Sequence, residues 1–352
     1  MELDDSFIAA WAKRLYMVKL LREITTGHSG SRIFEAEAGL RRYILRVSPF
    51  SEKKQAHAEF ETRWTAYLAS RMEGIAKPVR SVNGRRYEVM KAEGRPYILA
   101  LQEKAPGKLV DSDDPNAFNQ ELFFHLGMQM GNMHKWTMRY EGNVACPEFQ
   151  WNGPHFWRKD IAVLDEDVRQ AETRLQRELE QLPMGKDSYG IVHFDIHTGN
   201  FLADHDKITI IDFEACQFNW YAADIASTLF FMVQKGAGPL RHLTEEARTA
   251  FAETYLISYL NGYFKTHTIG ADWIRRLDLF MRYQMIDEYV AAQIGWPDVS
   301  DPMRQWYLDW HKNRLKSHQP YVFLDYEKIL DQVYPVMQEK ERIDKQPGSG
   351  LW

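Results

Sequence analysis

The spacing of apolar and polar residues changes from a helical to a strand pattern within the first fifty residues. Residues 6–20 repeat apolar side chains at helical spacing. A strand that ends at Ile24 follows, and the segments 33–37 and 43–47 resemble two further short strands with a turn at Gly39 between them. This pattern predicts one helix followed by three antiparallel strands.

A second helix and two more strands complete the pattern of the N-terminal part. Residues 52–71 carry apolar side chains on one helical face. Strands are expected at 85–91 and 97–101, and the dipeptide Asn83-Gly84 before the first of them is a typical turn sequence. Five strands with one inserted helix predict a small lobe.

The pattern breaks at residues 104–107, Lys-Ala-Pro-Gly, which we interpret as a hinge. Helical spacing returns at 117–136 and 160–182, and residues 243–340 are mainly helical in pattern. The stretch 141–158 is rich in aromatic residues, Gly and Pro, which predicts an irregular loop.

The length of 352 residues exceeds what one hydrophobic core usually organises, so two lobes are expected. The break in the pattern places an N-terminal lobe at 1–103 and a larger C-terminal lobe at 104–345. Residues 346–352 begin with Gln-Pro-Gly-Ser-Gly and are expected to form a flexible tail.

Composition and charge exclude several classes of protein. The net charge is −5 and no basic patch with interleaved aromatic residues occurs, so nucleic acid is not an expected partner. The two cysteines, Cys146 and Cys216, lack metal-ligand spacing and fit a reducing compartment. The chain starts with an acidic segment unlike a signal peptide, and no stretch approaches the roughly 20 apolar residues that cross a bilayer. We therefore expect a soluble, cytoplasmic protein with no membrane partner.

The strongest chemical signal lies in short strands and loops between residues 189 and 213. One apolar run delivers Asp195, with Asn200 five residues later, and a second apolar run delivers Asp212. Phosphoryl transfer requires such a set: a carboxylate that orients the attacking hydroxyl, and a carboxylate and a neutral oxygen that hold Mg²⁺ on the phosphates. The spacing therefore predicts Asp195 as the catalytic residue and Asn200 and Asp212 as metal ligands.

Three motifs together resemble those of the aminoglycoside phosphotransferase and choline kinase group, a branch of the protein-kinase-like fold. They are His-x-Asp-x-x-x-x-Asn at 193–200, Ile-Asp-Phe-Glu at 211–214 and Asp-Ile-Ala at 224–226. The resemblance covers the small lobe and the chain to about residue 235. It implies that the Asp-Ile-Ala segment supports the catalytic loop and that His193 holds this loop by hydrogen bonds. Direct acid–base work by His193 is the alternative, so His193 stands beside Asp195 as a candidate catalytic residue.

The resemblance also implies a fold and an activity. The fold is a bilobal α+β kinase-like fold, with a small N-terminal lobe built on an antiparallel sheet and a larger, mainly helical C-terminal lobe. The activity is an ATP-dependent, Mg²⁺-assisted transfer of the γ-phosphate to a hydroxyl group of a small molecule.

The turn between the first two strands is the expected phosphate-covering loop of this fold. Gly27, Ser29 and Gly30 lie in it, and their backbone N–H groups would face phosphate oxygens. No Gly-Lys-Ser/Thr sequence follows, so the segment is not a P-loop, and a plain hairpin turn is the alternative interpretation.

The third strand carries Arg46 at the place where the family usually presents a lysine to the α- and β-phosphates. A guanidinium can grip phosphate oxygens through two N–H groups, so the charge is kept while the geometry changes. Its partner acid is expected in the helix 52–71, where we prefer Glu61 over Glu59.

The segment Gln102-Glu103-Lys104 is expected to dock the adenine ring on its backbone groups, and the sequence does not distinguish ATP from GTP. Three further residues keep two interpretations each. Glu214 either reaches a second Mg²⁺ or only occupies the position where protein kinases have glycine. His197 faces either the substrate or solvent, and His134 is interpreted as a hydrogen-bonded core histidine rather than a catalytic one.

The acceptor is expected to be a small molecule, because the short span between Asp212 and Asp224 leaves little room for a peptide-docking segment. Homoserine, a methylthio-sugar, an amino-alcohol and a sugar antibiotic are all compatible, and the oligomeric state is not indicated. Ordinary core or surface positions are the alternative interpretation for each candidate wall residue of the acceptor pocket; the candidates are Trp151, Trp157, Trp220, Tyr283, Asp287 and Glu288. A protein Ser/Thr kinase and a non-catalytic kinase-like structural protein are the alternative functions.

Overall fold

The computed structural model describes residues 3–24, 30–142, 149–153 and 165–344. The chain forms two compact units. Unit 1 comprises Met1–Lys108 and Thr209–Glu214, and unit 2 comprises Leu109–Ile208 and Ala215–Trp352. Residues 104–108 and 209–214 thus belong to the first unit, whereas the sequence pattern assigned them to the C-terminal lobe.

Unit 1 begins with helix α1 (Asp5–Tyr16), which the Asp4 side chain caps by accepting a hydrogen bond from the Ser6 N–H. The helix ends at Tyr16, so the predicted helix 6–20 is too long at its C-terminal end. Met17 adopts a left-handed conformation with φ 58°, and the N–H groups of Met17 and Val18 bond back to carbonyl groups of α1. This closing arrangement ends the helix and lets the chain continue as a strand.

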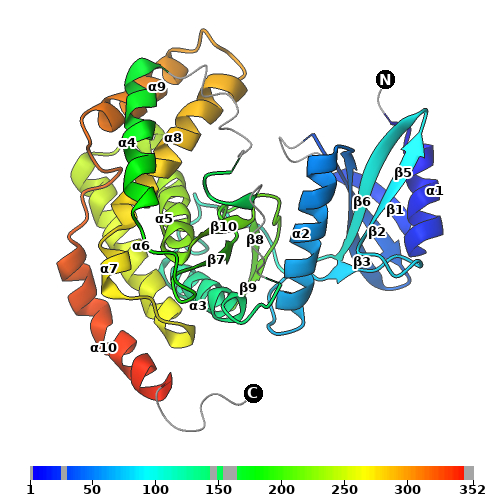
Figure 1. The fold of residues 1–352 in the computed structure, drawn as a ribbon, viewed down its shortest axis with the longest axis horizontal. Coiled ribbons are helices and arrows are strands. Elements are labelled where there is room, and N and C mark those ends of the chain that lie inside the picture. Colours follow the sequence, from blue (N-terminus) through cyan, green and yellow to red (C-terminus); the bar gives the residue numbers. More distant parts are fainter. Residues whose placement is uncertain (1–2, 25–29, 143–148, 154–164, 345–352) are drawn as a thin grey trace. The chain divides into compact units, whose positions relative to one another are not determined.

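One antiparallel sheet of six strands forms the body of unit 1 (Figure 1). The strand order is β1-β2-β3-β6-β4, and β5 also pairs with β6. The prediction of five strands missed β4, because a two-residue strand that starts with proline carries no alternating pattern. The strands are β1 (Lys19–Ile24), β2 (Arg32–Ala38), β3 (Arg41–Pro49), β4 (Pro78–Val79), β5 (Tyr87–Ala92) and β6 (Arg95–Glu103).

Apolar side chains of α1 and of the sheet form one core in unit 1. Ile8 and Trp11 of α1 pack in the same cluster as Leu45, Val47 and Leu99 of the sheet. These residues are almost completely withdrawn from solvent. Burial of this kind stabilises each large side chain by roughly 1.5–3 kcal/mol, so the core anchors the strand that carries the candidate phosphate-binding arginine.

Helix α2 (Glu52–Ala69) starts at a Ser51 cap, whose hydroxyl accepts a hydrogen bond from the Lys54 N–H. The segment Thr209–Glu214 reaches this unit by strand-like pairing: the Ile210 N–H donates to the Gly74 carbonyl over 2.9 Å. The ring of Phe213 meets the buried Trp64 of α2 edge-on, with centroids 5.4 Å apart. The segment that contains Asp212 is thus held against α2 by both its backbone and an aromatic side chain.

Unit 2 is mainly helical and contains two short strand pairs, β7 with β10 and β8 with β9, although the last two residues of β9 belong to unit 1 (Figure 1). The predicted helix 117–136 begins at Gln120, after an Asn119 cap, and the predicted helix 160–182 corresponds to Glu166–Glu180, with residues 160–164 outside the described part. The elements are α3 (Gln120–Thr137), α4 (Glu166–Glu180), β7 (Tyr189–Val192), β8 (Phe201–Asp204), β9 (Lys207–Ile210), β10 (Gln217–Trp220), α5 (Tyr221–Ala237), α6 (Glu245–Thr266), α7 (Ala271–Ile274), α8 (Leu277–Gly295), α9 (Pro302–Lys316) and α10 (Tyr326–Asp344).

Helices α3 and α6 approach each other closely because glycines face the opposite backbone. A Cβ atom on Gly127 of α3 would lie 1.9 Å from the Tyr259 carbonyl oxygen, and one on Gly262 of α6 would lie 1.9 Å from the Phe124 carbonyl oxygen. Contacts between real atoms do not become this short, so only glycine permits this packing. The close approach fixes how side chains of the two helices meet.

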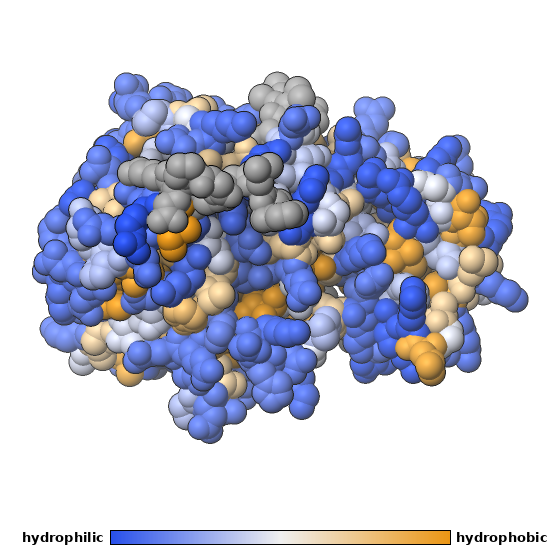
Figure 2. All heavy atoms as spheres, turned by 90° about the horizontal axis from the view of Figure 1, so that it is seen from below, coloured by the Kyte–Doolittle hydropathy of each residue, from blue (hydrophilic) through white to orange (hydrophobic). Residues whose placement is uncertain are grey.

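Among the described residues, no helix is long and apolar enough to cross a membrane. On the face of the molecule drawn in Figure 2, hydrophilic residues predominate and hydrophobic residues appear in small separate groups.

We expect Gly262→Ala to lower the free energy of unfolding by about 2–3 kcal/mol, because the added methyl group forces the two helix backbones apart. Urea unfolding of the variant and the wild type measures this loss. Gly295→Ala, at a position of α8 with no atom within 4 Å of the added Cβ, is the matched control and should cost far less. Equal stabilities of the two variants would contradict the close-packing argument.

Candidate active site

The loop between β7 and β8 brings together two of the residues that the sequence singled out. The Asn200 side chain donates from Nδ2 to the Asp195 carboxylate oxygen Oδ2 over 2.9 Å and to the Asp195 carbonyl over 2.8 Å. Because the amide nitrogen of Asn200 is engaged in this way, its amide oxygen is the atom suited to a metal ion. Asp195 and Asn200 are thus in direct contact, and their roles as catalytic residue and metal ligand stay predictions.

Two side chains of helix α5 support the backbone of this loop. The Asp224 carboxylate accepts hydrogen bonds from the backbone N–H of His193 over 3.0 Å and of Phe194 over 2.7 Å. The Ser227 hydroxyl, one turn later on α5, donates to the Phe194 carbonyl over 2.8 Å. Phe194 needs this support because its φ of 66° is unfavourable for a bulky side chain. The residue immediately before Asp195 is therefore held at both its N–H and its carbonyl group.

Two histidines of the loop have different surroundings. His193 is fully buried, and its Nδ1 accepts a hydrogen bond from the Asp195 N–H over 3.3 Å. His197 is partly exposed; its Nδ1 accepts from the Gly199 N–H over 3.0 Å, and its Nε2 lies 3.8 Å from Asp195 Oδ2. A direct catalytic role of His193 stays a prediction, whereas its contact with the loop backbone suits a supporting role. His197 lies beside the candidate catalytic carboxylate.

In unit 1, the guanidinium of Arg46 lies between two carboxylates. Arg46 Nη2 is 2.5 Å from Glu61 Oε2, and Arg46 Nη1 is 3.1 Å from Glu214 Oε1. Glu59 instead faces Arg63 on the exposed side of α2. The preferred partner acid is thus the one in contact, and the sequence did not foresee the second contact to Glu214.

The charges around Arg46 explain its ionisation. Burial opposes the charge on Arg46, but the nearby carboxylates of Glu61, Glu214 and Asp212 outweigh it and raise the pKa of this guanidinium. Burial raises the pKa of Glu61, although Arg46 counteracts this effect. Three carboxylates around one guanidinium leave an excess of negative charge, which favours a nearby cation.

Asp212 also has an unusual backbone conformation, with φ 58°, and its Oδ1 accepts a hydrogen bond from the Glu214 N–H over 3.4 Å. Among the residues that the structure describes, no group of three or more His, Cys, Asp or Glu side chains forms a closed metal site. Mg²⁺ in phosphoryl-transfer enzymes usually takes only one or two carboxylates from the protein and completes its shell with phosphates and water. Asp212 in unit 1 and Asn200 in unit 2 each offer an oxygen atom of the kind that Mg²⁺ prefers, and their role as metal ligands stays a prediction.

The predicted phosphate-covering loop is only partly described. Gly27 and Ser29 lie outside the described residues, whereas Gly30 has φ 70°, a conformation that glycine adopts at no steric cost. The following residue, Ser31, hydrogen-bonds to the Ser48 hydroxyl over 2.8 Å and lies 3.5 Å from Glu214 Oε1. The end of this loop and the segment after Asp212 therefore meet next to Arg46.

The predicted hinge follows the end of β6. The N–H of Glu103 donates to the Lys77 carbonyl over 2.9 Å, and the N–H of Lys104 donates to the Arg42 carbonyl over 3.0 Å. Gln102 is paired with β3 and β4 in the sheet. Because the N–H groups of Glu103 and Lys104 are already bonded within the protein, an adenine ring that docks here would use backbone carbonyl groups or the N–H groups of residues after Lys104. The adenine contact itself stays a prediction.

The candidate wall residues of the acceptor pocket divide into two groups. Trp151 and Trp220 are almost completely buried and pack on each other with ring centroids 5.3 Å apart, which agrees with the alternative interpretation as core residues. Large aromatic surfaces of this kind are most stable inside a core. Trp157 lies outside the described residues.

Residues of α8 remain compatible with such a wall. The ring of Tyr283 meets Phe194 edge-on, with centroids 5.4 Å apart, which brings α8 to the catalytic loop. Asp287 follows one helical turn later, and Glu288 accepts a hydrogen bond from the Tyr307 hydroxyl over 3.0 Å. Burial raises the pKa of Glu288.

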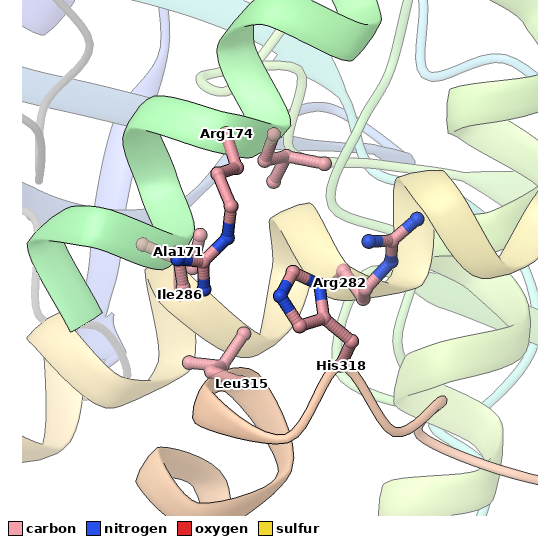
Figure 3. Close-up of a pocket in the computed structure, with 7 residues that line it drawn as sticks. Ala171, Arg174, Arg282, Ile286, Leu315 and His318 are labelled. Atoms are coloured by element: carbon pink, nitrogen blue, oxygen red, sulfur yellow. The ribbon is translucent and has the colours of Figure 1, made fainter. Parts of the chain in front are cut away.

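A separate small cavity lies among α4, α8 and α9 (Figure 3). Figure 3 shows Arg174 and His318 turned toward its interior, whereas the guanidinium of Arg282 points away, and Arg282 binds Glu178 over 3.1 Å. None of the predicted site residues lines this cavity.

Residues 21–269 match the model of the phosphotransferase enzyme family. This chain belongs to that family. It is 30% identical over 254 residues to the amicoumacin kinase of Bacillus subtilis (strain 168), an alignment that covers 71% of this chain and 73% of the relative. The predicted family and the predicted class of enzyme, a phosphotransferase with an alcohol group of a small molecule as acceptor, are thereby confirmed.

Solved structures show the same fold. An amicoumacin kinase in complex with AMP-PNP, Ca²⁺ and Ami has a TM-score of 0.79 and 23% identity, and the match covers 93% of this chain and 97% of that one. A microcompartment-associated aminopropanol kinase has a TM-score of 0.66 and 19% identity, with coverage of 90% and 98%. The predicted kinase-like fold is confirmed, and the predicted use of ATP and a divalent metal ion agrees with this membership.

The sequence did not indicate that Ser227 binds the Phe194 carbonyl or that Glu214 contacts Arg46. Ser227 lies three residues after Asp224 on one helix, a spacing that places both side chains on the same face. That spacing was the only available signal. Nothing in the sequence near Glu214 shows that its carboxylate reaches an arginine more than 160 positions earlier.

We expect Arg46→Gln to lower the free energy of unfolding by about 2–3 kcal/mol at neutral pH, because it leaves the Glu61 carboxylate buried without its cation. A carboxyl group whose pKa is higher in the folded than in the unfolded state destabilises the fold as the pH rises between the two values. The loss relative to wild type should therefore shrink as the pH is lowered and Glu61 becomes protonated.

Urea unfolding of both proteins at acidic and neutral pH tests this expectation. Arg63→Gln, which removes the exposed partner of Glu59, is the control and should leave stability nearly unchanged at either pH. A loss for Arg46→Gln that is the same at both pH values would speak against the buried pair.

Proposed function

We propose that this protein transfers the γ-phosphoryl group of ATP to a hydroxyl group of amicoumacin or of a chemically related small molecule. The observation that carries this proposal is the alignment with the amicoumacin kinase of Bacillus subtilis, which spans most of both chains. The fold match to a kinase in complex with AMP-PNP, Ca²⁺ and Ami supports it. An amino-alcohol is the second candidate acceptor, because the aminopropanol kinase has the same fold over most of its length.

In the proposed reaction, Asp195 orients the acceptor hydroxyl and accepts its proton as the new oxygen–phosphorus bond forms and the bond between the γ-phosphorus and the departing ADP breaks. Asn200 holds the Asp195 carboxylate by the hydrogen bond from Nδ2, and the buried Asp224 holds the loop backbone. These contacts preorganise the carboxylate, which is the main contribution that a protein makes to phosphoryl transfer.

Asp212 and the amide oxygen of Asn200 would hold Mg²⁺, which when bound neutralises charge on the phosphate oxygens. Arg46 would contact the α- and β-phosphates, with its guanidinium oriented by Glu61 and Glu214. The loop that contains Gly27, Ser29 and Gly30 would cover the phosphates with backbone N–H groups.

A cytoplasmic location is part of the proposal because ATP is the donor. The absence of a nucleic-acid partner stays a prediction from the low net charge and the lack of a basic patch.

Release of ADP from Mg-ATP in the presence of single acceptors tests the function. The panel contains amicoumacin, aminopropanol, homoserine and an aminoglycoside, each with wild type and with Asp195→Asn. We expect amicoumacin to stimulate the wild type most strongly, and Asp195→Asn to lose at least about 100-fold in rate while still binding Mg-ATP. A near-normal rate of Asp195→Asn would refute the assignment of this residue.

Other outcomes of the panel would redirect the assignment. Stimulation by aminopropanol alone would favour the amino-alcohol. Binding of Mg-ATP without stimulation by any compound would favour a protein acceptor, and no binding of nucleotide would favour a non-catalytic protein.

We expect Asp212→Ala to weaken nucleotide binding in the presence of Mg²⁺ by about tenfold or more, and to change binding little in its absence. Calorimetric titration of AMP-PNP with and without Mg²⁺ measures both affinities. Asp206→Ala, in the exposed turn between β8 and β9, is the matched control and should behave as wild type. Unchanged Mg²⁺ dependence of Asp212→Ala would exclude Asp212 as a metal ligand.

A further inference from the structure

A continuous line of hydrogen bonds leads from α6 through α3 to the catalytic loop. The Tyr263 hydroxyl lies 2.8 Å from His134 Nδ1, and His134 Nε2 lies 3.0 Å from Asp224 Oδ2. Asp224 in turn binds the backbone N–H groups of His193 and Phe194. The side chains of Tyr263, His134 and Asp224 are all 0% exposed, so water does not compete for these bonds.

The direction of each bond follows from the chemistry of the partners. The Asp224 carboxylate only accepts hydrogen bonds, so His134 donates to it from Nε2. A neutral imidazole that donates from Nε2 accepts at Nδ1, and the Tyr263 hydroxyl is the donor there. Burial raises the pKa of Tyr263, so its hydroxyl keeps the proton that it donates. The contacts thus select one tautomer of His134.

The packing of the two helices keeps Tyr263 in place. Gly127 and Gly262 allow the backbones of α3 and α6 to touch, and Tyr263 follows Gly262 directly. The ring of Tyr263 also contacts the ring of His134, with centroids 5.6 Å apart. The hydroxyl therefore reaches His134 from a rigid surface.

The network ends at the least favourable backbone conformation of the loop. Phe194, with φ 66°, would relax to a negative φ if Asp224 were displaced, because left-handed conformations cost a bulky residue on the order of 1–2 kcal/mol. Relaxation of Phe194 would turn the peptide that leads to Asp195. The position of the Asp195 carboxylate thus depends on how firmly Asp224 is held.

We propose that Tyr263 is a positioning residue for phosphoryl transfer: its hydroxyl holds the His134 ring at Nδ1, so that Nε2–H stays aimed at Asp224, and His134 and Asp224 thereby keep the loop in the conformation that presents Asp195. This inference rests on the proposed role of Asp195. The sequence interpreted His134 as a hydrogen-bonded core residue, and the structure shows both of its partners.

The variant Tyr263→Phe removes the hydroxyl alone and keeps the ring. We expect kcat to fall roughly tenfold, because the variant loses about one buried hydrogen bond. The KM values for ATP and acceptor should be nearly unchanged. Tyr255→Phe is the matched control. It lies on the same helix, is equally buried and has a hydroxyl without a hydrogen-bond partner among the described residues, so its kcat should equal that of wild type.

A double variant tests whether Tyr263 acts through His134. If it does, Tyr263→Phe combined with His134→Ala should be no slower than His134→Ala alone. Rates are measured below the unfolding temperature of every variant and are normalised to folded protein. Independent, multiplying losses, or equal kcat values of Tyr263→Phe and Tyr255→Phe, would overturn the proposal.

A measurement without substrate separates this proposal from the proposed function. The ¹⁵N chemical shifts of the His134 ring report its tautomer, and hydrogen exchange reports the protection of the His193 and Phe194 N–H groups. Tyr263→Phe should alter the ring shifts and exchange these two amides roughly tenfold faster, whereas Tyr255→Phe should not. If the wild type phosphorylates no acceptor but these changes occur, the proposed function fails and the positioning network stands. Unchanged ring shifts and exchange would refute the network even in an active enzyme.

Discussion

The buried carboxylate of Asp224 is the interaction on which the candidate catalytic loop depends. It sits in the first turn of α5, where the helix dipole favours a negative charge, and it receives two backbone N–H groups and the Nε2 of His134. A charge fully removed from water is tolerable only when its oxygens are satisfied in this way. The cost of leaving Asp224 unpaired is what keeps Phe194 left-handed, and the conformation of Phe194 determines where Asp195 lies.

A second constraint acts in unit 1, where the charges are reversed: a cation is held by carboxylates. Arg46 is held by two carboxylates and remains charged despite its burial. Because a guanidinium has several N–H groups in one plane, it can keep the Glu61 contact while another edge faces a second acid or a phosphate. An ammonium group is a point charge and offers no such division of edges. The contact to Glu214 therefore depends on the presence of an arginine at this strand position.

The motifs of the loop and the change of spacing along the chain predicted the family, the kinase-like fold and the class of enzyme, each of which is confirmed. The errors concern the boundaries of elements. The first helix ends at Tyr16 because backbone groups of Met17 and Val18 close it, which apolar spacing does not reveal. For Trp151 and Trp220 the sequence left a pocket wall and a core position open, because an aromatic residue has the same local signal in both places, and both side chains are buried.

The sequence by itself determined which polar residues stand at the ends of the apolar strands, and so which groups were available for phosphoryl transfer. Only the tertiary structure decided which of them are held rigidly, because the contacts to Asp224, His134 and Tyr263 join residues that are far apart along the chain. The contact between Tyr263 and His134 depends on the close packing of α3 against α6, and a hydrogen bond forms only when both atoms are brought within about 3 Å in the right direction. Local pattern reports residue type and spacing, whereas the distance between two helices depends on every side chain that packs between them.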